Sequence, residues 1–152
     1  FFLGITFNWG LVMAYISVSN NISAEIIVLY MSAIFWTLGY DTIYGAQDIS
    51  DDEIIGLKST SVKFKNNIKL FIGVSYLINV LLLTYLFKTD IGYNFFSVLF
   101  FFFIITLFYQ ILKFNKNQPK SCLKMFKINN ISRPLIYFAI LPFALAVPPL
   151  PR

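Results

Sequence analysis

Long apolar runs, separated by short polar segments, form the main pattern along the chain. Five runs approach the length of about 20 residues that a helix needs to cross the hydrocarbon layer of a membrane. They cover residues 1–19, 24–45, 68–87, 91–112 and 134–150. The last run is shorter and contains four prolines, so we expect its helix to be kinked or frayed. The pattern predicts an all-α fold, a multi-pass transmembrane helix bundle of about five spans that forms one domain over residues 1–152.

Composition supports an integral membrane protein. The chain of 152 residues is 58% hydrophobic and only 12% charged, with a mean hydropathy of +0.73. Soluble domains carry about 25% charged residues, so this chain is too apolar for that class. It begins at Phe1 inside an apolar run, and no Lys or Arg precedes Lys58. A signal peptide would carry such a basic segment, so we expect a piece of a longer protein that lacks its N-terminal part.

The basic residues favour one orientation in the membrane. Ten of the twelve lie in or beside the two segments that follow the second and fourth runs: Lys58, Lys63, Lys65, Lys69, Lys113, Lys116, Lys120, Lys124, Lys127 and Arg133. The positive-inside rule places both segments on the cytoplasmic side, or on the matrix side of a mitochondrial inner membrane. Basic residues beside a membrane commonly meet anionic lipid headgroups, so the net charge of +5 predicts no nucleic-acid partner.

The basic segment 113–133 contains a second, shorter amphipathic pattern. Between residues 119 and 130, Lys120, Lys124 and Lys127 share one helical face, and Leu123 and Phe126 lie elsewhere. This pattern is typical of a helix that lies in the membrane interface. Such a helix could cover the mouth of a cavity or anchor the segment.

The residue types that are absent limit the chemistry. The chain has no His, and its one cysteine, Cys122, has no second cysteine to pair with. Haem sites, His-based metal sites and His-dependent nucleophiles are therefore excluded from these residues, as is an internal disulfide. Carboxylates without His favour a hard cation such as Mg²⁺.

Most of the acidic residues are gathered in one place. Five of the seven lie between Asp41 and Glu53, at the exit of the second apolar run and in the start of the segment 46–67. If the helix continues through that exit, residues four apart share a face. The stripe then consists of Tyr40, Tyr44, Asp48 and Asp52, with Asp51 beside it.

A cation would balance the mutual repulsion of these carboxylates. Mg²⁺ usually takes one or two carboxylates and leaves its other positions to water and phosphate oxygens. Gly56 permits a turn that brings Lys58 and Ser59 back toward the acidic residues. Together these groups predict a site for a diphosphate on an apolar tail. A plain solvated loop is an alternative, as is a cation pathway in a transporter or channel that uses Asp41.

The motif that spans residues 40–60, YDTIYGAQDISDDEIIGLKST, resembles the second Asp-rich motif of the UbiA family of intramembrane prenyltransferases. It is most similar to the branch that prenylates 4-hydroxybenzoate. Two further segments, LGITFNWGLVMAY near the start and CLKMFKINN at 122–130, are similar to other family motifs. The resemblance therefore covers nearly the whole chain.

The resemblance implies nine helices around a cavity open to lipid, with two Asp-rich loops that hold Mg²⁺ against a polyprenyl diphosphate. Asp48 and Asp52 match the DxxxD pair of the second loop, and Asp51 would be an auxiliary metal ligand. Lys58, with the hydroxyl of Ser59 nearby, would help to neutralise the diphosphate. Asp41 would orient the aromatic acceptor or the helix end, and Tyr40 and Tyr44 would offer ring faces to the allylic cation.

The implied activity is Mg²⁺-dependent transfer of a polyprenyl group to the ring of 4-hydroxybenzoate in ubiquinone biosynthesis. It would take place in a bacterial or mitochondrial inner membrane. The first Asp-rich motif of the family, NDxxDxxxD, does not occur in these residues. We therefore expect the active protein to need a missing N-terminal half as its partner, and we expect this chain alone to be inactive.

Overall fold

The computed structural model describes residues 2–19 and 21–145, with the side chains of residue 18 and of 143–145 left out. Within these ranges the regular elements are helices, so the predicted all-α fold is confirmed. In chain order they are α1 (Phe2–Ser19), α2 (Ala24–Gly45), α3 (Ile49–Ile54), α4 (Thr60–Lys63), the 3₁₀ turn η1 (Lys65–Asn67), α5 (Ile68–Leu86), α6 (Phe95–Lys113), α7 (Pro119–Lys127) and α8 (Asn129–Leu145).

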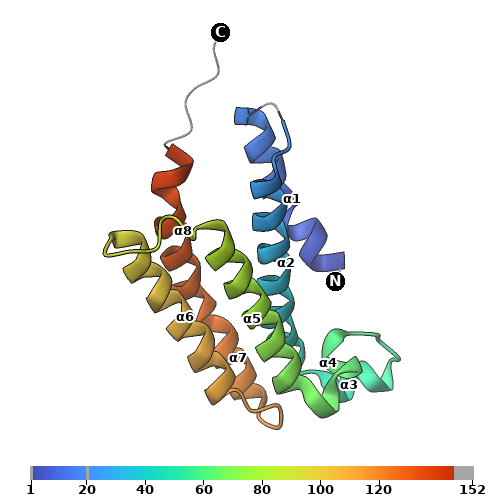
Figure 1. Cartoon of the computed structure of the whole chain (residues 1–152). Helices are drawn as coiled ribbons and strands as arrows, with labels where there is room; N and C mark the ends of the chain where they lie inside the picture. The colour runs from blue at the N-terminus through green and yellow to red at the C-terminus, as the bar shows by residue number, and fades with distance from the viewer. Residues whose placement is uncertain (1, 20, 146–152) are drawn as a thin grey trace.

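The long helices form a bundle in which α2 is central. Helix α2 packs along α5 and also contacts α1 and α7, and α6 packs along α8. The short helices α3, α4 and α7 lie at one end of the bundle, and the α1–α2 turn and the α5–α6 loop lie toward the other end (Figure 1). The acidic segment and the basic segment are therefore placed at the same end.

Among the described residues, three helices are long and apolar enough to cross a membrane, which confirms a membrane protein. They are α2, the stretch Lys65–Leu86 that contains α5, and α6. Helix α1 is apolar but shorter by the same measure, so its span stays a prediction. Helix α8 continues through both Pro134 and Pro142. Residue 1 and residues 146–150 of the predicted spans lie outside the described residues.

Among the described residues, the boundaries of the predicted spans differ from the structure mainly at the starts of α8 and α6. The fifth run was expected to begin at residue 134, but α8 begins at Asn129. The fourth run was expected to begin at residue 91, but α6 begins at Phe95. Asn94 is the reason, because its side-chain Oδ1 accepts a hydrogen bond from the Ser97 N–H at 2.9 Å and caps the helix there. Apolar composition alone does not reveal such a cap.

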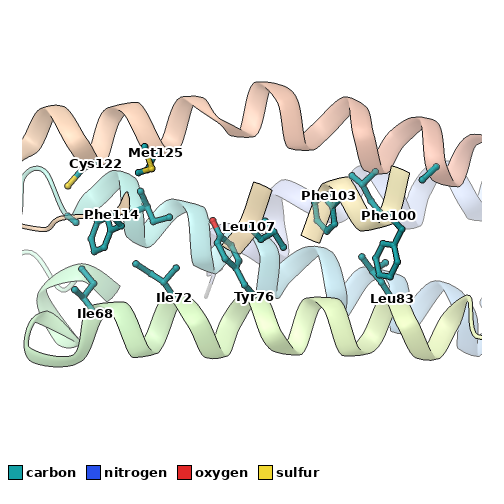
Figure 2. Close-up of a cluster of buried hydrophobic side chains, with 14 of the residues drawn as sticks. Ile68, Ile72, Tyr76, Leu83, Phe100, Phe103, Leu107, Phe114, Cys122 and Met125 are labelled. Carbon is teal, nitrogen blue, oxygen red and sulfur yellow. The ribbon is translucent and has the colours of Figure 1, made fainter. Parts of the chain in front are cut away.

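The core lies between α5, α6 and the helices that pack on them. In Figure 2, Ile72, Tyr76 and Leu83 of α5 point toward Phe103 and Leu107 of α6. All five side chains are buried. Phe side chains on the other faces of α6 are exposed, as expected for a surface that meets lipid: Phe101, Phe102 and Phe108.

A chain of polar side chains crosses this core. The Tyr76 hydroxyl donates to Gln110 Oε1 at 2.7 Å, and Gln110 Nε2 lies 3.4 Å from both Asn129 Oδ1 and Ser132 Oγ. These contacts join α5, α6 and the start of α8. Hydrogen bonds between membrane helices contribute roughly 0.6 kcal/mol each on average, so the chain sets the relative position of the helices more than it stabilises them.

The two basic segments meet directly. Lys116 Nζ, in the segment after α6, donates to the backbone oxygen of Lys65 at 3.0 Å. Both segments therefore lie on the same side of the bundle, as the charge pattern requires. Which compartment that side faces stays a prediction, and so does the position of α7 in the membrane interface.

Candidate active site

The acidic residues follow a break in the helix. Helix α2 ends at Gly45 and α3 begins at Ile49, so the stripe expected from one continuous helix does not form. At the exit of α2 the hydrogen bonds shorten from four-residue to three-residue spacing, with Gln47 N donating to Tyr44 O and Asp48 N donating to Gly45 O. This tightening ends the helix and lets the chain change direction.

Asp48 and Asp52 nevertheless remain one helical turn apart. Asp48 is the N-cap residue of α3, and the N–H of Asp52 donates to its backbone oxygen at 2.8 Å. The Asp48 side chain makes no capping hydrogen bond, so its carboxylate oxygens are free to bind something else. Asp48 and Asp51 are exposed and Asp52 is partly buried. Carboxylates in the first turn of a helix are also favoured by the helix dipole.

Gly56 ends α3 in a defined way. Its φ of +72° lies in the left-handed region, which residues with a Cβ atom adopt only with strain. The Gly56 N–H donates to Glu53 O at 3.3 Å and the Leu57 N–H donates to Asp52 O at 2.8 Å. This pair of bonds is the Schellman motif, a frequent helix ending. The turn that the sequence predicted at Gly56 is confirmed.

After the turn, hydroxyl groups of the chain form hydrogen bonds with α2. The Ser61 Oγ donates to Thr42 O at 3.1 Å, and the Thr42 and Thr60 hydroxyls lie 2.9 Å apart. Ser59 caps α4, with its Oγ accepting from the Val62 N–H at 3.2 Å. Sequence reasoning missed Thr42 and Thr60. The sequence feature that could have indicated this contact is the run of three hydroxyl residues at 59–61.

An exposed ion pair joins α3 to η1. Lys65 Nζ lies 2.7 Å from Glu53 Oε2, with the two side chains 46% and 40% exposed. An exposed pair of this kind contributes at most about 1 kcal/mol. Among the described residues, Lys58 and the three aspartates of the segment form no ion pair. Lys58 and the aspartates are therefore available to a ligand, whereas Glu53 is already paired.

The two predicted tyrosines lie in different environments. Tyr40 is only 7% exposed and its ring lies among Trp36, Phe126 and the Arg133 guanidinium, which is 5.6 Å from the ring centroid. Tyr44 is 42% exposed, and its ring lies 4.8 Å from that of Phe126. Tyr44 therefore offers the more accessible ring to a ligand. Asp41, the third predicted substrate residue of this turn, is partly buried.

Helix α7 packs against α2, where the Phe126 ring lies beside that of Tyr44. Its Lys120, Lys124 and Lys127 are exposed, whereas Cys122 and Met125 are buried. Burial raises the pKa of the Cys122 thiol, and the negative charge of Asp48 acts in the same direction. The thiol is therefore held in its neutral form, which suits a packing role and not a nucleophile.

The side chains of the acidic segment fit a hard divalent cation. The described residues contain no ready-made group of three His, Cys, Asp or Glu side chains that could enclose a metal, so Asp48, Asp51 and Asp52 as a set of ligands stay a prediction. Mg²⁺ requires no such group, because one or two carboxylates suffice when phosphate and water fill the other positions. Asp48 and Asp52, one turn apart and unpaired, meet that requirement.

An apolar cavity of about 500 Å³ lies within the bundle. Its wall includes residues of α1, α2, α5, α6 and α8, among them Trp36 and Phe103. Arg133 also lines it, and it connects the cavity to the buried Tyr40 ring. Helix α2 therefore lines the cavity with Trp36, and the acidic segment follows the C-terminal end of the same helix.

Comparison with known proteins identifies the family. The profile of the UbiA prenyltransferase family matches residues 1–131. A mitochondrial 4-hydroxybenzoate polyprenyltransferase from Dictyostelium discoideum is 34% identical over 136 residues, which cover 85% of this chain and 28% of that protein. A 4-hydroxybenzoate octaprenyltransferase from Psychromonas ingrahamii is 33% identical over 130 residues, 84% of this chain and 45% of that protein.

Over a shorter stretch, the mitochondrial 4-hydroxybenzoate polyprenyltransferase of Arabidopsis thaliana is 46% identical in 72 residues, 47% of this chain and 18% of that protein. The chain thus spans less than half the length of these relatives. No solved structure gives a significant match. The match of the family profile to most of the chain agrees with the membrane helices and the acidic segment, and the chain belongs to the UbiA prenyltransferase family.

Proposed function

We propose that the chain is part of an enzyme that transfers a polyprenyl group from polyprenyl diphosphate to the ring of 4-hydroxybenzoate, with Mg²⁺, in ubiquinone biosynthesis. The observation that carries this proposal is the pair Asp48 and Asp52, one turn apart on α3 and directly beyond the membrane end of α2. The names of the relatives support the same reaction and acceptor.

The unpaired charged side chains of the acidic segment would have parts in this reaction. Asp48 and Asp52 would hold Mg²⁺, with Asp51 as a further ligand, and the ion would stabilise the negative charge that develops on the leaving diphosphate. Lys58 contributes a positive charge to the same group. The exposed ring of Tyr44 faces the allylic cation, for which a contact is worth about 0.5 to 2 kcal/mol. An apolar cavity such as the one lined by Trp36 and Phe103 would keep water away from that cation.

The test replaces Asp48 or Asp52 by Asn in the full-length protein. Each change preserves size and removes one negative charge, so prenyl transfer is expected to fall by at least about a hundredfold while binding of 4-hydroxybenzoate changes little. Glu53→Gln is the matched control, because Glu53 lies in the same segment but is paired with Lys65. Its activity should stay close to that of the parent. Equal losses in all three variants would contradict the proposal.

A cation transporter or channel is the second candidate, because a carboxylate also lies within α2 at Asp41. The two functions respond differently to the same variants. A transporter with Asp48→Asn or Asp52→Asn would lose ion flux in vesicles, and its flux would not depend on diphosphate lipid.

We further propose that this chain alone has no transferase activity, because the first Asp-rich motif of the family, NDxxDxxxD, is not among its residues. The purified chain in lipid vesicles, given a polyprenyl diphosphate, 4-hydroxybenzoate and Mg²⁺, is expected to form no prenylated product above the level of empty vesicles. Product formation that is lost with Asp52→Asn would contradict this expectation.

A further inference from the structure

A pocket of about 420 Å³ lies where the start of α5 meets the segment between α6 and α7. Residues 66–70 form one side of its wall and residues 114–117 form the other. Both sides lie at the end of the bundle that also carries α3, α4 and α7 (Figure 1). The hydrogen bond from Lys116 Nζ to the backbone oxygen of Lys65 joins the two sides across 51 residues of sequence. The pocket is therefore a product of the fold and not of one local segment.

The wall of the pocket carries positive charges and amide groups. Of its nine described residues, three are apolar, two are the cations Lys69 and Lys116, and none has a carboxylate. The other four are asparagines: Asn66, Asn67, Asn115 and Asn117. Among the described residues Lys69 forms no ion pair, and the Asn67 side chain makes no hydrogen bond to the helix that follows it. Ammonium and amide N–H groups gathered without an anion favour a ligand that carries a phosphate.

An apolar stripe on α5 begins at the same pocket. Leu70 lines the pocket, and Val74, Leu77 and Leu81 follow it along the helix. Residues at these spacings share one helical face, and all four side chains are exposed. Helix α5 belongs to a stretch that is long and apolar enough to cross a membrane. A basic pocket and a surface for a hydrocarbon chain are therefore joined at Leu70.

We propose that the pocket binds the phosphate of an anionic glycerophospholipid from the surrounding membrane, with an acyl chain along the stripe on α5. Lys69 and Lys116 balance the charge of the phosphate, and the asparagine amides donate to its oxygens. Basic pockets beside membrane helices on the cytoplasmic or matrix side recognise such headgroups. The described wall has no carboxylate to hold Mg²⁺, so the site is distinct from that of Asp48 and Asp52. It goes beyond the proposed transfer reaction and does not depend on it.

The experiment measures lipid binding to the purified full-length protein in detergent micelles by native mass spectrometry. Phosphatidylglycerol is compared with phosphatidylcholine of the same acyl chains, because both contain a phosphate and only phosphatidylglycerol has a net negative charge. The protein is expected to bind phosphatidylglycerol at least about tenfold more tightly. Excess inorganic phosphate should not displace the lipid, because it makes no contact with the stripe. Complete displacement would identify a site for free phosphate and would contradict the proposal.

Two double variants separate this pocket from a general attraction to basic surfaces. Lys69→Gln with Lys116→Gln removes two charges from the wall, so the preference for phosphatidylglycerol should fall below about threefold. Lys120→Gln with Lys124→Gln removes the same charge from the exposed face of α7, outside the wall, and should keep the preference. Thermal unfolding, followed by circular dichroism, should be alike in both. Equal losses in the two variants, or an unchanged preference in the first, would overturn the proposal.

This proposal and the proposed transfer reaction can fail separately. Asp52→Asn should lose prenyl transfer and keep the preference for phosphatidylglycerol, because Asp52 is not among the residues of the pocket wall. Loss of the preference in Asp52→Asn would mean that the lipid binds at the acidic segment, and the pocket would then not be its site.

Discussion

At Gly39 the backbone of α2 lies directly against the ring of Tyr76, and a Cβ atom at this position would overlap the ring. The same tyrosine hydroxyl bonds Gln110 across the core. The absence of a side chain at one residue therefore sets how closely α2 and α5 approach. In the sequence Gly39 was only one of seven glycines, and its role became visible only when the partner helix was placed.

The variant Gly39→Ala is therefore expected to displace the Tyr76 ring and lower the free energy of unfolding by about 1–3 kcal/mol, the usual cost of overpacking. Gly73→Ala on α5 is the matched control, because a Cβ atom there meets nothing within 4 Å. The control should be neutral or slightly stabilising, since Ala favours helix. Unfolding of both variants in micelles, followed by circular dichroism, compares them. Equal stabilities would show that the Tyr76 ring moves aside without lowering the free energy of unfolding.

At the scale of elements, the acidic motif was located by the sequence but its shape was not. The helical spacing of Tyr40, Tyr44, Asp48 and Asp52 indicated one face, and the spacing holds separately within α2 and within α3. After the break at Gly45 the chain returns to α2, where Thr42 contacts Thr60 and Ser61, 18 and 19 residues away in sequence. Periodicity reports local contacts only, so it could not reveal this bend.

The end of α3 gives a prediction at the same scale. Gly56→Ala forces a residue with a Cβ atom into the left-handed region, at a cost of about 1–2 kcal/mol. We expect faster amide hydrogen exchange in α3 and, in the full-length protein, a higher KM for the diphosphate. Gly56→Asn should come closer to the parent, because Asn tolerates this conformation better. Identical exchange in both variants and the parent would mean that the Schellman turn does not hold α3.

For the whole molecule, the sequence predicted the all-α class and the grouping of the charges, and three of its five expected spans are long and apolar enough among the described residues. It did not predict the cavity, because Trp36, Asn79 and Phe103 come from three different helices. Nor did it single out Arg133 as a neighbour of Tyr40, a contact between residues far apart in the chain. Features of one helix could be inferred from its own residues, whereas features between helices required their arrangement.

The orientation of the whole bundle can be tested by labelling. In a Cys122→Ser background, a single cysteine replaces Lys58, Lys116 or Tyr93 on the connecting segments; positions 58 and 93 are exposed and position 116 is partly exposed. The contact of Lys116 with Lys65 places the first two on one side of the bundle, and the positive-inside rule predicts that this side is cytoplasmic or matrix-facing. A membrane-impermeant maleimide applied from outside should label position 93 alone. Labelling of position 58 or 116 in intact cells would reverse the orientation.

The shortness of α3 has a thermodynamic consequence. An isolated helix needs about 12–15 residues to be stable in water, and α3 has six, so its order depends on the turns at its two ends. Release of either turn would let Asp48 and Asp52 separate. Cation binding would then include the entropic cost of bringing them together again. Calorimetry should therefore find a more unfavourable binding entropy in Gly56→Ala than in the parent. The affinity of the site for its ion would depend on a glycine that never touches it.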